Sequence, residues 1–172
     1  MVEIGAGPKR GTKGWLTLDS CEGSDIQWSL ENGLPFNDSS VQAIYASHVL
    51  EHFYYSELLF LLSECWRVLD LGGVLSVAVP NARLYIDAYY NKTDFPPKEK
   101  VYTPAISNTG SEIDKLNYIA YMDGHHKYMF DTECLIRILE RCNFKSCALR
   151  EYDPNLDLSG RDFESIYAKA YK

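Results

Sequence analysis

The sequence predicts an α/β protein with a doubly wound, mainly parallel sheet that ends in a C-terminal antiparallel strand pair. Three observations predict this class. Short apolar runs that end in Gly, Asp or Ser recur in the amino-terminal third of the chain. A strand, a helix, a Gly-Gly turn and a second strand then follow one another, as in a βαβ unit. Near the end, "FKSCALREY" and "FESIYAKAYK" flank the polar loop "DPNLDLSG", which favours an antiparallel pair.

The elements are expected in the following order. Strands are predicted at Val2–Ile4, at Trp15–Leu18 before Asp19, more weakly at Ile26–Leu30, and at Ala43–Ser47. A helix begins near Ser56, because apolar residues recur at helical spacing at Leu58, Leu61, Leu62, Cys65 and Leu69. The "LGG" at 71–73 ends that helix, and "VLSVAVP" reads as a buried strand that Pro80 closes.

A second helix is predicted after Asp131, whose side chain can cap it. Its inward face consists of Leu135, Ile138, Leu139 and Cys142. Asn143 can take the left-handed turn that usually needs glycine. Between the two helical regions, Ala82–Phe130 is rich in tyrosine and has no clear period. We therefore expect one domain over residues 1–172, with a loop-rich insert at about 82–130 that acts as a lid or substrate region.

Composition limits the classes of function. The chain has 172 residues, a formal net charge of -7 and no large basic cluster, which disfavours a nucleic-acid substrate. No stretch approaches the about 18 apolar residues of a membrane span. Five cysteines without a C-x-x-C motif or a signal peptide indicate reduced thiols in a cytoplasmic protein.

The glycines in "VEIGAGPKRG" indicate a sharp turn after the first strand, where a ligand could approach the backbone. A dinucleotide fingerprint needs a third glycine where Arg10 stands, and a phosphate-binding loop needs a Gly-Lys-Ser/Thr that is absent. Two glycines alone are explained equally well by a tight structural turn.

The wider pattern is more specific. Glu3 precedes the glycines, Asp19 ends the next strand, and "LPFNDSSVQAIYASHVLEHF" and "ECWRVLDLGGVLSVAVPN" follow. In order and spacing this resembles the class I S-adenosylmethionine (SAM)-dependent methyltransferases, particularly small bacterial enzymes with "lPF...HvLEH...RvLkpGG". The resemblance is strong over residues 2–81, with a weaker echo in "GHHKYMFDTECLIRILERCNF". It implies a Rossmann-like methyltransferase sheet and SAM as the cofactor.

The resemblance also implies a set of cofactor-binding residues. The glycine turn would cradle the methionine and ribose portions, Glu3 would help to hold the amino end, and Asp19 would accept hydrogen bonds from the ribose hydroxyls. The residues implied in cofactor binding are Glu3, Gly5, Ala6, Gly7, Asp19, Ser20, Ser29, Leu30, Ser47 and His48. Ser29 stands where related sequences often carry an acidic residue for the adenine amine.

Two features raise the question of how the site closes. Seven residues separate Gly7 from Trp15, so the first crossover helix is about one turn long, or the two strands are not neighbours. The helix that precedes the first strand in many relatives is also missing. We expect the insert to cover the strand ends, with His125 or Tyr128 within reach of the pocket, and a homodimer to contribute to the cover.

The chemistry needs alignment more than a specific catalytic group, because methyl transfer is an in-line displacement. The catalytic residues are left open, with His48, His52, His125 and Tyr128 as weak candidates; for His52 a scaffolding role is favoured. No metal is expected, since no Cys/His pair has usable spacing. The first hypothesis is a methyltransferase for a small-molecule or sugar-like acceptor. The alternatives are a non-catalytic SAM- or nucleoside-binding protein, or a partner subunit of another enzyme.

Overall fold

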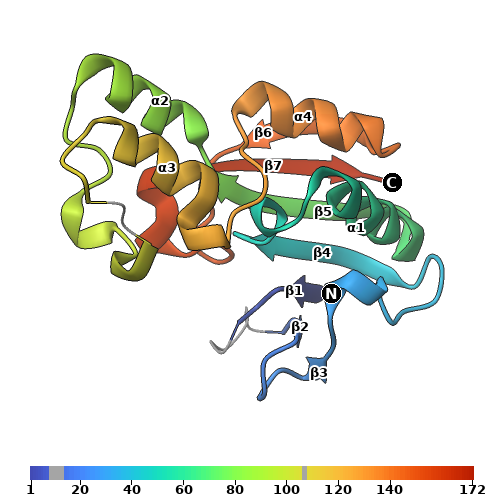
Figure 1. The fold of residues 1–172 in the computed structure, drawn as a ribbon. Helices are drawn as coiled ribbons and strands as arrows, with labels where there is room; N and C mark the ends of the chain where they lie inside the picture. Colours follow the sequence, from blue (N-terminus) through green and yellow to red (C-terminus); the bar gives the residue numbers. More distant parts are fainter. Residues whose placement is uncertain (8–13, 106–107) are drawn as a thin grey trace.

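The fold is a single seven-stranded sheet with helices, seen in a computed structural model that describes residues 1–7, 14–105 and 108–172 (Figure 1). The strand order is β3-β2-β1-β4-β5-β7-β6. The strands are β1 (Val2–Ile4), β2 (Leu16–Asp19), β3 (Ile26–Gln27), β4 (Val41–Ser47), β5 (Leu69–Pro80), β6 (Lys145–Arg150) and β7 (Ser165–Tyr171). Neighbouring strands are parallel, except that β7 runs antiparallel to β5 and β6. The predicted fold class is therefore confirmed.

The short first crossover does not separate β1 from β2. The two strands pair in parallel, with Glu3 opposite Thr17, and Glu3 faces Tyr45 of β4 on its other side. The alternative that these strands are not neighbours is therefore wrong. The helical turn predicted between them falls on residues 8–13, which lie outside the described residues.

One face of the sheet is covered by α1 (Tyr55–Val68) and α4 (Thr132–Arg141) (Figure 1). The buried residues of α1 include four of the five predicted apolar positions, but Leu69 is a correction. It belongs to β5, because it is buried there and pairs with Val41. In α4 the prediction is confirmed: the Asp131 side chain accepts a hydrogen bond from the Cys134 amide at 2.7 Å, and Asn143 has φ 69°.

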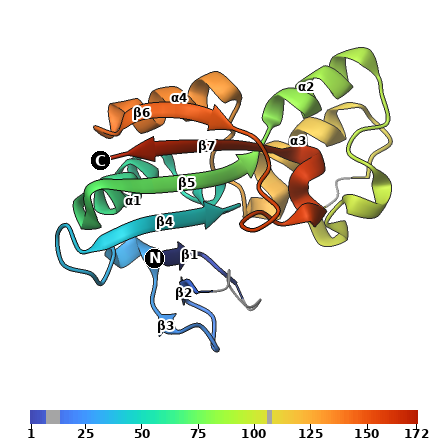
Figure 2. The same ribbon diagram turned by 180° about the vertical axis from the view of Figure 1, so that it is seen from behind.

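The opposite face carries no described helix (Figure 2). A group of polar and aromatic side chains lies there, which we call the sheet-face network; its members are Tyr45, Ser76, Arg150, Asp157 and Tyr167. The Asp157 carboxylate accepts hydrogen bonds from the Tyr45 hydroxyl at 2.8 Å and from two Arg150 nitrogens at 2.6 and 2.7 Å. Arg150 also donates to Ser76 at 2.9 Å and lies over the Tyr167 ring. In the described residues, the hydrogen bonds of this network, rather than a packed helix, stabilise this face of the sheet.

The insert is not loop-rich, which corrects the sequence interpretation. It contains α2 (Ala82–Asn91) and α3 (Ile113–Tyr121), joined by single helical turns. These helices share a small core of their own, formed by Ala82, Tyr85, Ala105, Tyr118 and Ile119. Exposed apolar and aromatic residues in these helices, such as Ile86, Tyr90 and Tyr121, obscured the helical period. The insert lies beyond the carboxyl ends of β4 and β5 rather than on the open face of the sheet (Figures 1 and 2).

Arg67 holds the "LPFND" loop against α1. Its guanidinium donates to the carbonyl oxygens of Leu34 and Phe36 at 3.0 Å, and it pairs with Glu64 and Asp38 at 2.7 Å. The Glu64 carboxylate in turn accepts a hydrogen bond from the Leu34 amide. This arrangement gives a structural reason for the spacing between the two motifs.

All five cysteines are free thiols. None of the described helices is both long and apolar enough to span a membrane.

Candidate functional site

The site begins at the turn after β1, where the two glycines have different roles. Gly5 has φ 64°, and a Cβ atom there would lie 2.4 Å from a methyl group of Val49. Gly5 is therefore required by close packing. Gly7 has φ 66°, and a Cβ atom there would have no neighbour within 4 Å among the described residues. Gly7 is therefore required by its backbone conformation.

Asp19 lies at the end of β2 and is tied to this turn. One carboxylate oxygen accepts a hydrogen bond from the Gly7 amide at 2.8 Å, and the other accepts from the Cys21 amide at 2.9 Å. Ser20 contacts the second oxygen at 3.4 Å. Partial burial raises the pKa of Asp19, but the hydrogen bonds from Cys21 and Gly7 outweigh it and hold the pKa below the usual value. Asp19 is therefore ionised at neutral pH, and its oxygens keep lone pairs for ligand hydroxyls.

A cleft of about 230 Å³ runs from Asp19 along the ends of the neighbouring strands. Four of the predicted cofactor residues line it: Asp19, Ser20, Ser29 and Leu30. Glu31 and Glu57 also face the cleft, together with His52. This places carboxylates around the cleft, which suits a cationic ligand that carries hydroxyl groups.

The other predicted cofactor residues lie on neighbouring strands. Glu3 is the middle residue of β1 and Ala6 lies between the two glycines. Ser47 is the last residue of β4. Ligands of doubly wound sheets bind outside the carboxyl ends of the strands, where the strand order reverses. Here that point lies between β1 and β4, because β1 is followed outward by β2 and β4 by β5.

His48 directly follows β4 and has φ 54°, which is uncommon for a residue other than glycine. Its ring is buried, and Nε2 lies 2.8 Å from the Ser165 hydroxyl. Burial holds the pKa of His48 well below its usual value, with the charge of Arg161 acting in the same direction. His48 is therefore a neutral, hydrogen-bonded ring in the protein interior directly after β4.

A second, larger cavity of about 630 Å³ lies between the insert and the segment before β7. His52, His125 and His126 line it, together with Tyr102, Arg161 and Glu164. The insert contacts the turn after β4 here, since His52 Nδ1 lies 2.9 Å from the His125 carbonyl oxygen. His52 lines both this cavity and the cleft beside Asp19. The two hollows therefore meet at one side chain.

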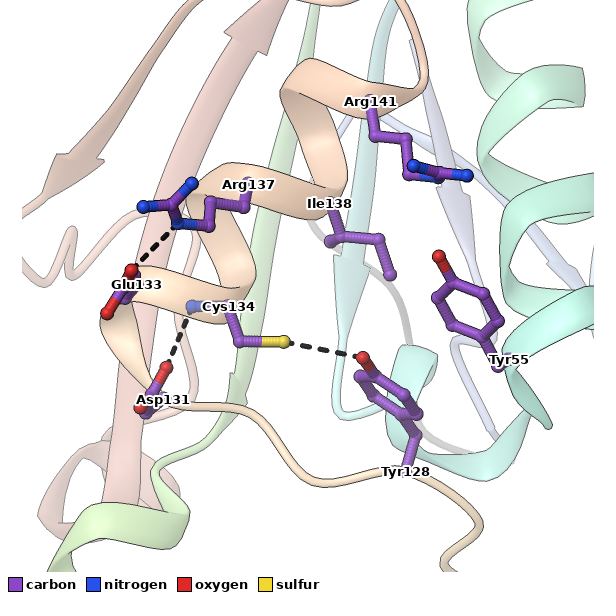
Figure 3. Close-up of a pocket in the computed structure, with 8 residues that line it drawn as sticks. All are labelled: Tyr55, Tyr128, Asp131, Glu133, Cys134, Arg137, Ile138 and Arg141. Atoms are coloured by element: carbon purple, nitrogen blue, oxygen red, sulfur yellow. Dashed lines mark hydrogen bonds and ion pairs between the residues drawn. The ribbon is translucent and has the colours of Figure 1, made fainter.

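Tyr128 lies elsewhere. It lines a pocket of about 360 Å³ between the start of α1 and α4, where its ring stacks on Tyr55 and its hydroxyl lies 3.5 Å from the Cys134 sulfur (Figure 3). None of the predicted cofactor residues lines this pocket. Of the four weak catalytic candidates, His52 and His125 line the larger cavity, whereas His48 and Tyr128 do not.

Sequence reasoning missed two residues of this region. Glu51 is buried, and Arg161 lines the larger cavity. Glu51 lies inside "HVLEHF", a motif that the sequence analysis had singled out. Its neighbours in the sequence are Leu50 and His52, and this spacing gives no signal of a buried carboxylate.

Comparisons with known proteins match the chain to methyltransferases. A family model described as a methyltransferase domain matches residues 3–77. A SAM-dependent methyltransferase from Thermotoga maritima matches 99% of this chain and 81% of its own, with 16% identity and a TM-score of 0.56. One from Archaeoglobus fulgidus matches 99% and 85%, with 16% identity and a TM-score of 0.58.

A third structure is 1,6-didemethyltoxoflavin-N1-methyltransferase from Burkholderia thailandensis, with bound 1,6-didemethyltoxoflavin and S-adenosylhomocysteine. It is 12% identical, covers 99% of this chain and 69% of its own, and has a TM-score of 0.58. At these identities the structures show the fold. No curated protein sequence matches the chain.

The whole chain therefore has the doubly wound sheet of these solved methyltransferases. Within residues 3–77 it also matches the methyltransferase domain model.

Proposed function

We propose that the chain methylates a small-molecule or sugar-like acceptor that binds in the larger cavity beside His52. The main observation behind this proposal is that His52 lines both the cleft at Asp19 and the cavity of about 630 Å³, so the two are adjacent. A cavity of this size suits a small molecule. The Burkholderia structure contains such an acceptor together with the demethylated cofactor.

The residues on the cleft side fit the cofactor. Asp19 is ionised and lines the cleft, as binding of ribose hydroxyls requires, and its carboxylate accepts a hydrogen bond from the Gly7 amide. Glu31 and Glu57 supply negative charge for a cationic ligand. When bound, SAM supplies a methyl group already activated by its sulfonium.

The protein's own contribution is alignment and exclusion of water. The insert covers the strand ends at β4 and β5, and its backbone is fixed there: the Lys127 amide donates to the Glu51 carbonyl at 2.8 Å, and the His125 carbonyl accepts from His52. We propose that His52 and His125 contact the acceptor. Cytoplasmic location and a homodimer stay predictions; light scattering of the purified chain tests the dimer.

The cofactor assignment is tested with S-adenosylhomocysteine. We expect Asp19→Ala to weaken its binding by about 1.5–3 kcal/mol, because a charge-assisted hydrogen bond is lost. Glu22→Ala is the matched control, since it removes an exposed carboxylate of the same loop that does not line the cleft. Calorimetry measures both. An unchanged affinity in folded Asp19→Ala would contradict the ribose assignment.

The acceptor assignment is tested at Gly160, which lines the larger cavity and has no atom within 4 Å of an added Cβ. We expect Gly160→Phe to fill the cavity, leave S-adenosylhomocysteine affinity unchanged and reduce turnover in a screen of amine, hydroxyl and sugar acceptors. Binding without turnover on any acceptor in the wild type would favour the non-catalytic alternative, and absence of binding would favour the partner-subunit alternative.

A further inference from the structure

Glu51 is a buried carboxylate whose side chain has no hydrogen-bond partner among the described residues. Its side chain is 2% exposed, and neither oxygen accepts a hydrogen bond from any described residue. The nearest basic nitrogens, His48 Nδ1 and His52 Nε2, lie 3.5 and 3.9 Å from Oε1. Buried carboxylates without donors are rare, because the lost hydration is not replaced. A proton on this carboxyl or a bound cation is therefore needed to offset the lost hydration.

Two neighbouring histidines, His52 and His126, each have one ring nitrogen without a proton that is free to bind a ligand. His52 Nδ1 lies 2.9 Å from the carbonyl of His125, and His126 Nδ1 lies 2.8 Å from the carbonyl of Ile119. A carbonyl oxygen accepts only, so Nδ1 carries the proton in both rings. With that proton on Nδ1, the Nε2 of each neutral ring has a lone pair that can bind a cation.

His48 shows the same arrangement. The Ser165 hydroxyl donates to the Arg161 carbonyl at 2.7 Å, so its oxygen accepts from His48 Nε2–H. The unprotonated Nδ1 of His48 then faces Glu51 Oε1 at 3.5 Å. Lone pairs of His48 and His52 thus face an oxygen that has lone pairs of its own. Two acceptors facing each other without a proton or cation between them repel.

We propose that Glu51, His52 and His126 bind a divalent transition-metal ion such as Zn²⁺ or Mn²⁺. One ligand atom of each of these side chains lies within 4.8 Å of the other two. Ligands of one ion at about 2.1 Å are at most about 4.2 Å apart, so small side-chain rotations complete the site. Two imidazoles and one carboxylate select first-row transition metals and leave coordination positions open. Carbonyl partners on the far ring nitrogens are typical of metal-binding histidines.

The open positions would face the larger cavity, which His52 and His126 line. This role rests on the proposed function: an oxygen or nitrogen of the acceptor binds the metal there and is held beside the cleft at Asp19. The sequence analysis expected no metal because it compared only the spacing of cysteines and histidines along the chain. The fold brings His126 of the insert to the "LEH" turn after β4, which no linear spacing shows.

The test is binding of Zn²⁺ and Mn²⁺ alone, measured by calorimetry and by anomalous scattering from crystals. We expect one ion per chain at Glu51, and more than about tenfold weaker binding in Glu51→Gln and His52→Ala. Glu51→Gln changes a buried residue and could unfold the protein. The His52 side chain is 40% exposed, so His52→Ala is expected to stay folded and provides the second test. His125→Ala is the matched control: it removes a neighbouring exposed histidine and keeps the carbonyl that orients His52.

Several outcomes would overturn the metal site. These are no binding by the wild type, equal binding in all four proteins, or an ion located away from Glu51. S-adenosylhomocysteine binding and turnover are measured on the same samples with and without a chelator. Cofactor binding and turnover without metal binding would remove this inference and leave the proposed function standing. Metal binding at Glu51 without cofactor binding would support the metal site and contradict the proposed function.

Discussion

The two faces of the sheet are stabilised in different ways, although they are built from the same strands. In β4, Ile44 and Ala46 belong to the apolar core under α1 and α4, whereas Tyr45 between them belongs to the sheet-face network. In β5, Val77 packs in the core and Ser76 accepts a hydrogen bond from Arg150. One face is held by non-directional burial and the other by directional hydrogen bonds around one carboxylate.

This difference decides how each face responds to change. An apolar core loses stability in proportion to the atoms removed, and neighbours partly relax into the space. A buried ionic network depends on every partner, because removal of one leaves the others desolvated without compensation. The absence of a described helix on the second face therefore makes Asp157 as important as a large core side chain.

The largest expected effect is on the network. Asp157→Ala should lower the free energy of unfolding by about 3–5 kcal/mol, because Arg150 and Tyr45 lose their buried partner. Urea denaturation measures it. The matched control is Glu133→Gln, which breaks the exposed Arg137 pair and should change stability by about 0.3–0.5 kcal/mol. Equal effects of the two variants would mean that the network is no more important than a surface pair.

A comparable but more variable effect is expected on the helix-covered face. Leu139 of α4 is fully buried in the core. Leu139→Ala should lower the free energy of unfolding by about 2–5 kcal/mol through the lost burial and the cavity. The loss should be the same at neutral and acidic pH, since no titrating group is involved. A loss that grows toward acidic pH would show that the two faces are coupled.

The pH dependence of stability separates the faces further. Burial raises the pKa of Asp157, but Arg150 and the Asp153 amide outweigh it and hold the pKa below the ordinary 3.8. A depressed carboxyl pKa stabilises the fold above the unfolded pKa and loses that contribution as the pH falls through the folded value. Wild type and Leu139→Ala should therefore lose stability below about pH 4, with part of this loss missing in Asp157→Ala. Parallel curves for all three would contradict this assignment.

The smallest expected effect concerns a single atom of the network, the hydroxyl oxygen of Tyr45. Tyr45→Phe removes the hydroxyl that donates to Asp157 and leaves the two Arg150 bonds in place. We expect a loss of about 0.5–1.5 kcal/mol, because Asp157 keeps its charged partner. Denaturation in urea checks it, and a loss as large as that of Asp157→Ala would show that the ring rather than the ion pair holds this face.

The sequence predicted the fold well wherever periodicity was local. The strands at Val2–Ile4 and Ala43–Ser47 and the helix after Asp131 follow from spacing and capping alone. Leu69 was misplaced because a buried strand that directly follows a helix continues its apolar pattern. The insert was read as loops, since only Tyr85 and Tyr118 of its tyrosines face its small separate core, whereas Tyr90 and Tyr121 are exposed.

The site was only partly predictable. Asp19, Ser20, Ser29 and Leu30 line one cleft because successive parallel strands end at one edge, which strand order makes foreseeable. Glu51 and His126 lie near each other only because the insert folds back onto the turn after β4. The sheet-face network likewise joins Tyr45 to Asp157 across most of the chain. Such contacts have no signature in linear spacing.

The position of His52 between the two hollows has a thermodynamic consequence. A ligand that reorients this ring in the larger cavity also changes the wall of the cleft beside Asp19. If acceptor binding alters cofactor affinity by some factor, the cofactor must alter acceptor affinity by the same factor, because the coupling free energy is reciprocal. One imidazole can thereby couple the affinities of the two ligands.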